Sequence, residues 1–139
     1  RLTTVTNGEA AEIVCRELND ARNAYGVKIA AYVIMPEHMH IMLWAESGRS
    51  ISNFMQRSMA RISKCLEPGA GRFWKERLRV LPLYSPAIIK IKIEYIHNNP
   101  IRLGLASNPS EWKYSSYCQL MMGNSDASLL CDIVEDFYL

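Results

Sequence analysis

The sequence lacks most of the features that mark special classes of protein. Its 139 residues contain no apolar run near the ~20 residues of a membrane-spanning helix, no secretory-signal pattern, no internal repeat and no low-complexity linker. Four cysteines are present, but no two form a Cys-x-x-Cys pair. This spacing argues against a cysteine zinc site and predicts buried free thiols in a reducing cytosol. We therefore expect a cytoplasmic globular domain without a membrane partner.

The sequence also lacks a large excess of charge of either sign, since 16 basic and 14 acidic residues leave a net charge of only +2. Such a total argues against a dedicated nucleic-acid binder. The distribution indicates otherwise: residues 49–113 hold 12 Lys and Arg against 4 Asp and Glu, a net +8, whereas residues 1–48 and 114–139 carry −2 and −4. A basic block between acidic ends is typical of a nucleic-acid-binding face, although a solvated surface explains it too.

The spacing of apolar residues predicts a mixture of strands and helices. Strands are expected over 2–6, 27–35, 38–44 and, with imperfect alternation, 72–81. Helices are expected over 9–25, 50–66 and 85–98, with Pro100 forcing the end of the third, and a further helix is expected from Ser128. The two middle strands read as a hairpin. This order predicts an α+β fold in which one antiparallel sheet carries helices on one face.

Two histidines, His38 and His40, lie two residues apart on a predicted strand that is otherwise apolar. Side chains at i and i+2 share one face of a strand. Two neighbouring imidazoles can hold a divalent cation through their neutral nitrogens. The alternative is a pair of ordinary histidines, but two such groups are costly to bury side by side unless something binds them.

Tyr95 and Asn99 lie four residues apart in the third predicted helix, which places them on the same side of it. A tyrosine that gives up its proton is a nucleophile, and an amide oxygen is a ligand for hard metal ions. Spacing alone favours a plainer interpretation, namely a core tyrosine and a helix stop at Asn99. His97 is expected to face elsewhere, about 200° around the helix from Tyr95.

Basic side chains form two groups within the basic block. One group shares a side of the second helix, and the other shares a face of the strand over 72–81. Both can contact phosphates, and both are equally compatible with a solvated surface. Together with two cations near Tyr95, the expected DNA contacts are Arg57, Arg61, Lys64, Lys75, Arg77, Arg79, Lys92 and Arg102.

Three linked segments resemble the motifs of one family. Tyr32–Leu43 (YVIMPEHMHIML) is similar to the MP-x-H-hydrophobic-H strand of the single-tyrosine HUH transposases. Lys92–Leu105 (KIEYIHNNPIRLGL) is similar to their YI-x-x-NP-hydrophobic-(R/K)-x-GL segment, and Glu111–Ser116 (EWKYSS) to their W-x-(Y/W)-SS element. The chain thus resembles the IS200/IS605-like Y1 transposase superfamily, and within it most of all the REP-associated tyrosine transposases.

The resemblance implies a ferredoxin-like HUH endonuclease core, with a single domain over 1–139, a core over about 2–118 and a C-terminal tail over 119–139. It implies that His38 and His40 ligate Mg²⁺ or Mn²⁺ and that Tyr95 is the nucleophile. Asn99 stands where insertion-sequence relatives have glutamine, so it is a possible third ligand. Glu37 stands where Asn or Asp is common and could add charge near the metal.

The function implied by the resemblance is metal-dependent cleavage and joining of single-stranded or hairpin DNA through a 5′-phosphotyrosine, by a monomer or a homodimer. Two alternatives stay open. One is a domesticated repeat-DNA-binding module of the same fold that no longer cleaves. The other is a small metal-dependent hydrolase, or an unrelated ferredoxin-like domain with a chance His-x-His, which predicts no salt-dependent DNA binding.

Overall fold

The structure, a computed structural model, describes residues 8–36, 38–66 and 86–132. At its centre, strands β1 (Lys28–Ile34) and β2 (Met39–Trp44) pair antiparallel as a hairpin. Both middle strands predicted from the sequence are therefore confirmed to within one residue at each end. The expected strands at 2–6 and 72–81 lie outside the described residues.

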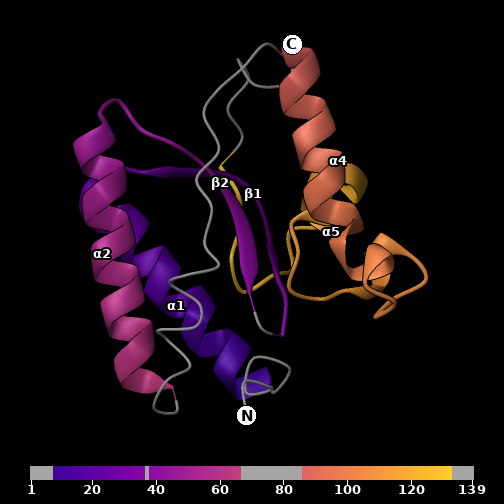
Figure 1. Cartoon of the computed structure of the whole chain (residues 1–139), viewed down its shortest axis with the longest axis horizontal. Coiled ribbons are helices and arrows are strands. Elements are labelled where there is room, and N and C mark those ends of the chain that lie inside the picture. The colour runs from indigo at the N-terminus through magenta and orange to yellow at the C-terminus, as the bar shows by residue number, and fades with distance from the viewer. Residues whose placement is uncertain (1–7, 37, 67–85, 133–139) are drawn as a thin grey trace.

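Helices cover both faces of this hairpin (Figure 1). On one face, α1 (Gly8–Tyr25) and α2 (Gly48–Cys65) pack against each other, and α4 (Pro86–Arg102) lies on the other face. The short η2 (Pro109–Glu111) and α5 (Tyr117–Met122) follow α4. The α+β class, with the antiparallel strands and helices of a ferredoxin-like core, is confirmed. In one detail the arrangement differs from the expectation, because α4 does not share a face with α1 and α2.

The composition of β1 explains why helices lie on both sides. Ile29, Tyr32 and Ile34 cluster with α1 and α2, whereas Ala31 and Val33 cluster with α4. None of these five side chains is more than 2% exposed. A strand with one polar face needs a helix layer only on the other. Because both faces of β1 are apolar, each needs its own cover.

Phe54 of α2 is fully buried between α1, α2 and the hairpin. We expect Phe54→Ala to lower the free energy of unfolding by ~3–5 kcal/mol, because it deletes a buried ring and leaves a cavity. Urea unfolding followed by circular dichroism measures the loss. Gln56→Ala, at an exposed position of the same helix, should change the value by less than ~0.5 kcal/mol. Similar losses in both variants would contradict this account of the core.

Helix α4 continues past Pro100 and ends at Arg102, so the prediction that Pro100 stops the helix is wrong. The end is set instead by Gly104, whose φ of 74° lies in the left-handed region. The Gly104 N–H donates to the Ile101 carbonyl at 3.0 Å, and the Leu105 N–H donates to the Pro100 carbonyl at 2.8 Å. These two hydrogen bonds form the Schellman ending that glycine favours at a helix C-terminus.

The segment after η2 pairs with the edge of β1 that β2 leaves open. The Ile34 N–H donates to the Tyr114 carbonyl at 2.8 Å, and the Ser116 N–H donates to the Tyr32 carbonyl at 3.0 Å. The Trp112 indole N–H donates to the Ile34 carbonyl at 2.9 Å. The W-x-Y-S-S element recognised in the sequence is therefore a short stretch of backbone that extends the sheet.

The chain after α5 packs on the same edge. The Asp132 N–H donates to the Ile29 carbonyl at 2.8 Å, and the Asp132 carboxylate accepts from the Ile29 N–H at 2.9 Å and from Arg22 at 3.1 Å. Residues 128–132 are not helical. The helix expected from Ser128 is thus wrong for this stretch, whose end pairs with β1 instead, and residues beyond 132 lie outside the described part of the chain.

All four cysteines are free, as their spacing predicts. Cys15 and Cys131 are buried, and burial raises the pKa of each thiol to about 12. Cys118 is half-buried and Cys65 is exposed, so burial holds for only two of the four. Among the helices within 8–36, 38–66 and 86–132, none combines the length and the apolar character needed to cross a membrane.

Candidate active site

The histidine pair meets the tyrosine where β2 faces α4. His38 immediately precedes β2 and His40 lies within it, and their ring centroids are 5.0 Å apart in an edge-to-face arrangement. The ring of Tyr95, on α4, lies 5.8 Å from that of His40. Strand periodicity predicts the first contact, whereas the second joins residues that are 55 positions apart in the sequence. The fold of this chain therefore brings the histidine pair and the tyrosine together.

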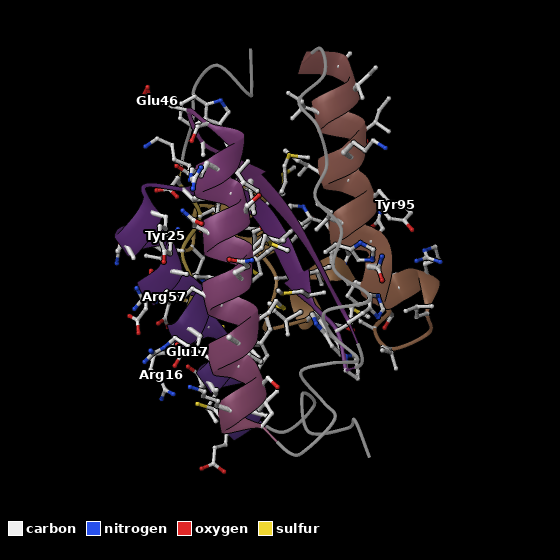
Figure 2. The ribbon with its side chains drawn as sticks, turned by 60° about the vertical axis from the view of Figure 1, so that its left-hand side comes forward. Arg16, Glu17, Tyr25, Glu46, Arg57 and Tyr95 are labelled. Atoms are coloured by element: carbon white, nitrogen blue, oxygen red, sulfur yellow. The ribbon has the colours of Figure 1, made fainter. Side chains whose placement is uncertain are left out.

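The side chains of this site differ in exposure in a way that suits a reaction at a surface. Tyr95 is 49% exposed, and His38 and His40 are half-buried. Figure 2 shows Tyr95 on α4, on the opposite side of the molecule from α2. A phenol that is half in solvent can reach a bulky polymer without any rearrangement of the fold.

Asn99, the third metal ligand that the resemblance implies, differs from the two histidines and Tyr95 in being completely buried. It follows Tyr95 by one helical turn but is fully buried. Neither its Oδ1 nor its Nδ2 has a hydrogen-bond partner among the described residues. An unpaired buried amide costs roughly 1–3 kcal/mol, so folded proteins seldom keep one without a use. A group that accepts a hydrogen bond from Nδ2, or a cation that Oδ1 coordinates, would offset this cost.

The donor set fits a divalent metal ion. Two imidazoles and an amide oxygen are all accepted ligands, and the unpaired Oδ1 of Asn99 supplies the orphaned polar atom that such an ion would satisfy. In the described part of the chain, no group of three or more His, Cys, Asp or Glu could hold a metal. Glu37, between Pro36 and His38, lies outside the described residues.

His97 turns away from this site, as helical spacing predicts. It is 3% exposed, and its Nε2 lies 2.8 Å from the Ser116 hydroxyl. The same hydroxyl accepts a hydrogen bond from the Tyr32 N–H at 3.0 Å. Burial lowers the pKa of His97 to about 4, so the ring is neutral at physiological pH. His97 thus links α4 to β1 through the hydrogen bonds of the Ser116 hydroxyl.

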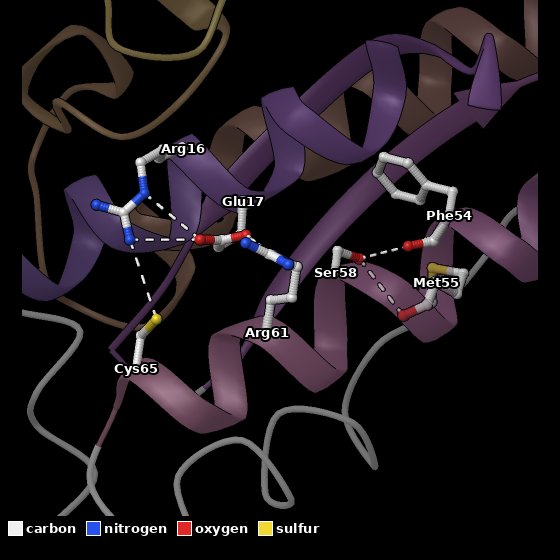
Figure 3. Close-up of polar contacts among 7 residues, drawn as sticks. All are labelled: Arg16, Glu17, Phe54, Met55, Ser58, Arg61 and Cys65. Carbon is white, nitrogen blue, oxygen red and sulfur yellow. Dashed lines mark hydrogen bonds and ion pairs between the residues drawn. The ribbon is translucent and has the colours of Figure 1, made fainter. Parts of the chain in front are cut away.

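The cations of α2 lie on the other face of the hairpin from Tyr95. Arg61 donates from Nε to the Glu17 carboxylate at 2.8 Å, and Arg16 reaches the same carboxylate at 3.3 Å (Figure 3). Glu17 is 3% exposed, so this ion pair joins α1 to α2. Arg57 and Lys64 lie on α2 as well, Arg57 half-buried and Lys64 exposed. The structure does not bring this group to the tyrosine.

The remaining expected DNA contacts divide into two sets. Lys92 and Arg102 lie on α4, the helix that carries Tyr95, with Lys92 half-buried and Arg102 exposed. Lys75, Arg77 and Arg79 lie outside the described residues. Of the expected DNA contacts whose position is described, Lys92 and Arg102 are therefore the two that lie on the same helix as the tyrosine.

Two other tyrosines are chemical rivals of Tyr95, and both are engaged elsewhere. Tyr114 donates to the Glu12 carboxylate at 3.0 Å, and burial together with this hydrogen bond raises the pKa of its phenol to about 12. The Tyr117 ring packs edge to face on His97, with centroids 5.4 Å apart. Neither makes a ring contact with His38 or His40 among the described residues.

Sequence reasoning missed the contact between Arg102 and Tyr95. Arg102 donates from Nη2 to the Tyr95 hydroxyl at 3.2 Å, and its Cζ lies 5.2 Å from the centre of the Tyr95 ring. The signal was present, since seven residues make about two helical turns. It was lost because Pro100 was expected to end the helix between the two residues.

The paired strands, the helices on them and the histidine pair beside a tyrosine helix define the class as an α+β domain with a ferredoxin-like HUH core. Comparison with known protein families gives a match to one family model. A family model described as "Transposase IS200 like" matches residues 2–99, which is more than half of the chain. The chain therefore belongs to the IS200-like transposase family, a family of DNA-cleaving enzymes. No match was found among curated proteins or among solved structures.

Proposed function

We propose that this protein is a metal-dependent, transposase-type endonuclease and strand transferase that acts on single-stranded DNA with hairpin or palindromic repeats. The observation that carries the proposal is the position of Tyr95 beside His40, 5.8 Å between ring centroids and half in solvent. Family membership supports DNA cleavage in general. The geometry supports the finer assignment of the nucleophile.

In this proposal, His38, His40 and Asn99 hold Mg²⁺ or Mn²⁺. When bound, such an ion polarises a phosphoryl oxygen and orients the scissile phosphate. The imidazole nitrogens bind such an ion in their neutral form. The buried amide of Asn99 gains the partner that it lacks among the described residues.

Tyr95 acts as the nucleophile. Its phenol oxygen forms a bond to phosphorus as the bond from phosphorus to the 3′ oxygen breaks, the phenol proton passes to solvent, and the leaving oxygen takes a proton. The products are a 5′-phosphotyrosine and a free 3′-hydroxyl. Because the covalent link keeps the energy of the phosphodiester, a 3′-hydroxyl can reverse the step and join strands without ATP.

DNA binding is proposed to centre on the α4 face. Lys92 and Arg102 share the helix with Tyr95 and supply positive charge beside the scissile phosphate. The α2 group is a poorer candidate, because Arg61 is held by Glu17 and the helix covers the opposite face of the hairpin. The proposed DNA-binding surface is therefore smaller than the whole basic block over residues 49–113.

An adduct assay tests the function. The wild-type protein is incubated with Mn²⁺ and a panel of hairpin-bearing single strands, labelled at either end. We expect the 3′-labelled strand to migrate with the protein on a denaturing gel, and the 5′-labelled fragment to be released with an extendable 3′-hydroxyl. A chelator should abolish both signals.

Two results would contradict the proposal. Hairpin binding without cleavage under any divalent metal would favour the non-cleaving repeat-DNA-binding module. Release of label without a protein adduct would point to hydrolysis by water and would remove Tyr95 from the reaction.

A further inference from the structure

Helix α4 continues beyond Pro100, and this brings Arg102 close to Tyr95, the proposed nucleophile. Because the helix ends at Arg102 and its ending is fixed by Gly104, Arg102 keeps helical geometry. Seven residues are about two turns, so Arg102 and Tyr95 lie on one side of α4. Arg102 also lies beyond residues 2–99, the part of the chain that the family model covers.

The Tyr95 ring is flanked by two nitrogen-bearing groups. His40 contacts it edge to face at 5.8 Å, and the Arg102 guanidinium lies 5.2 Å from its centroid. The guanidinium also donates a hydrogen bond to the phenol oxygen at 3.2 Å. The ring and the oxygen that is to react therefore each have a contact with a neighbouring side chain.

The Arg102–Tyr95 contact contributes little to the stability of the fold. Both side chains are exposed, and exposed polar pairs are worth at most about 1 kcal/mol. The guanidinium has five N–H donors, and its bond to Tyr95 uses one of them. Its fork geometry suits a phosphate oxygen, which lies next to the phenol oxygen at the moment of attack.

We propose that Arg102 is a positioning residue for Tyr95, which holds the phenol oxygen in line for attack and offsets the negative charge that develops on the phosphate. The inference rests on the proposed function of Tyr95. During attack, the phosphodiester with its single negative charge gains the charge of the phenol oxygen, and this charge leaves with the 3′ oxygen. A cation held close to the phenol oxygen and the 3′ oxygen lowers the barrier to cleavage and to the reverse reaction that joins strands.

Single-turnover adduct formation tests the role of Arg102. We expect Arg102→Gln to lower the maximal rate by about 100-fold, the size typical for removal of one oriented donor, with the half-saturating DNA concentration changed less than ~3-fold. Arg102→Lys should recover part of the rate, because it keeps the charge but not the fork. Lys90→Gln, which removes an exposed cation of the same helix, is the matched control and should react like wild type.

Chemical rescue separates positioning from mere folding. In Arg102→Ala, added guanidinium at low millimolar concentration should raise the rate at least ~5-fold, whereas it should leave Lys90→Ala and the wild type unchanged. An unchanged maximal rate in Arg102→Gln would overturn the inference. The inference would also be overturned if weaker DNA binding alone accounted for the slower reaction of Arg102→Gln.

A measurement without catalysis keeps the test independent of the proposed function. In protein labelled with ¹³C at tyrosine Cζ, the Tyr95 resonance is assigned by its loss in Tyr95→Phe. It should move in Arg102→Gln and stay in place in Lys90→Gln. If the wild type forms no adduct, the proposed function fails, and this resonance still decides whether Arg102 holds Tyr95: an unmoved resonance overturns the inference.

Discussion

The Tyr95→Phe variant is expected to form no covalent adduct with DNA, a loss of at least ~10⁴-fold, because removal of a nucleophile leaves only the contributions of binding and charge. The substitution removes one oxygen from a side chain that is 49% exposed, so the fold should be unaffected. Affinity for a hairpin strand should stay within a few fold of wild type. Denaturing gels measure the adduct, and fluorescence anisotropy measures binding.

Tyr117→Phe is the matched control, because Tyr117 is a partly exposed phenol that packs on His97 rather than on the histidine pair. It should form the adduct at the wild-type rate. Peptide mapping of the wild-type adduct should place the DNA on Tyr95. An adduct in Tyr95→Phe above ~1% of wild type, or a DNA-linked peptide that contains Tyr117, would contradict the assignment.

The second large effect is expected at the metal site. His40→Ala should weaken Mn²⁺ binding by at least ~100-fold and slow adduct formation by about 10³-fold, because the ion is proposed to supply several kcal/mol of transition-state stabilisation. His38→Ala should behave in the same way. Calorimetric titration with Mn²⁺ measures affinity directly, and the rise in Tm on addition of Mn²⁺ measures it through linkage.

Asn99→Ala sharpens this test, because it should affect stability and metal binding differently. Deletion of a buried amide without a partner should leave the metal-free protein as stable or make it more stable, while the affinity for Mn²⁺ falls about 10-fold. Asn98→Ala, one position earlier and exposed, should change neither quantity. A loss of metal-free stability in Asn99→Ala, together with unchanged Mn²⁺ affinity, would show that Asn99 is only a packing residue.

Local periodicity was enough to predict the hairpin and the approximate extent of α1, α2 and α4. It failed where long-range pairing decides the structure. Residues 128–132 have no helix because Asp132 pairs with Ile29, about a hundred positions away. The predicted end of α4 was too early because it was based on Pro100 alone. Gly104, whose positive φ ends the helix, was the better indication of the helix end.

The candidate site shows the same division. The His38–His40 contact follows from the period of a strand, and the family motif indicated Tyr95 and Asn99. The sequence could not show that Asn99 is buried without a partner, nor that Arg61 is occupied by Glu17, which lies 44 positions earlier on another helix. Charge counting identified the cations but not the partners that occupy them.

The pairing of β1 on both sides has a consequence for assembly. One edge bonds to β2 and the other to Tyr114, Ser116 and Asp132, so no row of unpaired backbone groups on this strand is left as a template. β-augmentation by a second copy, or by a foreign peptide, is therefore blocked at β1. Addition of a strand to this hairpin by a partner would therefore have to take place at β2 and not at β1.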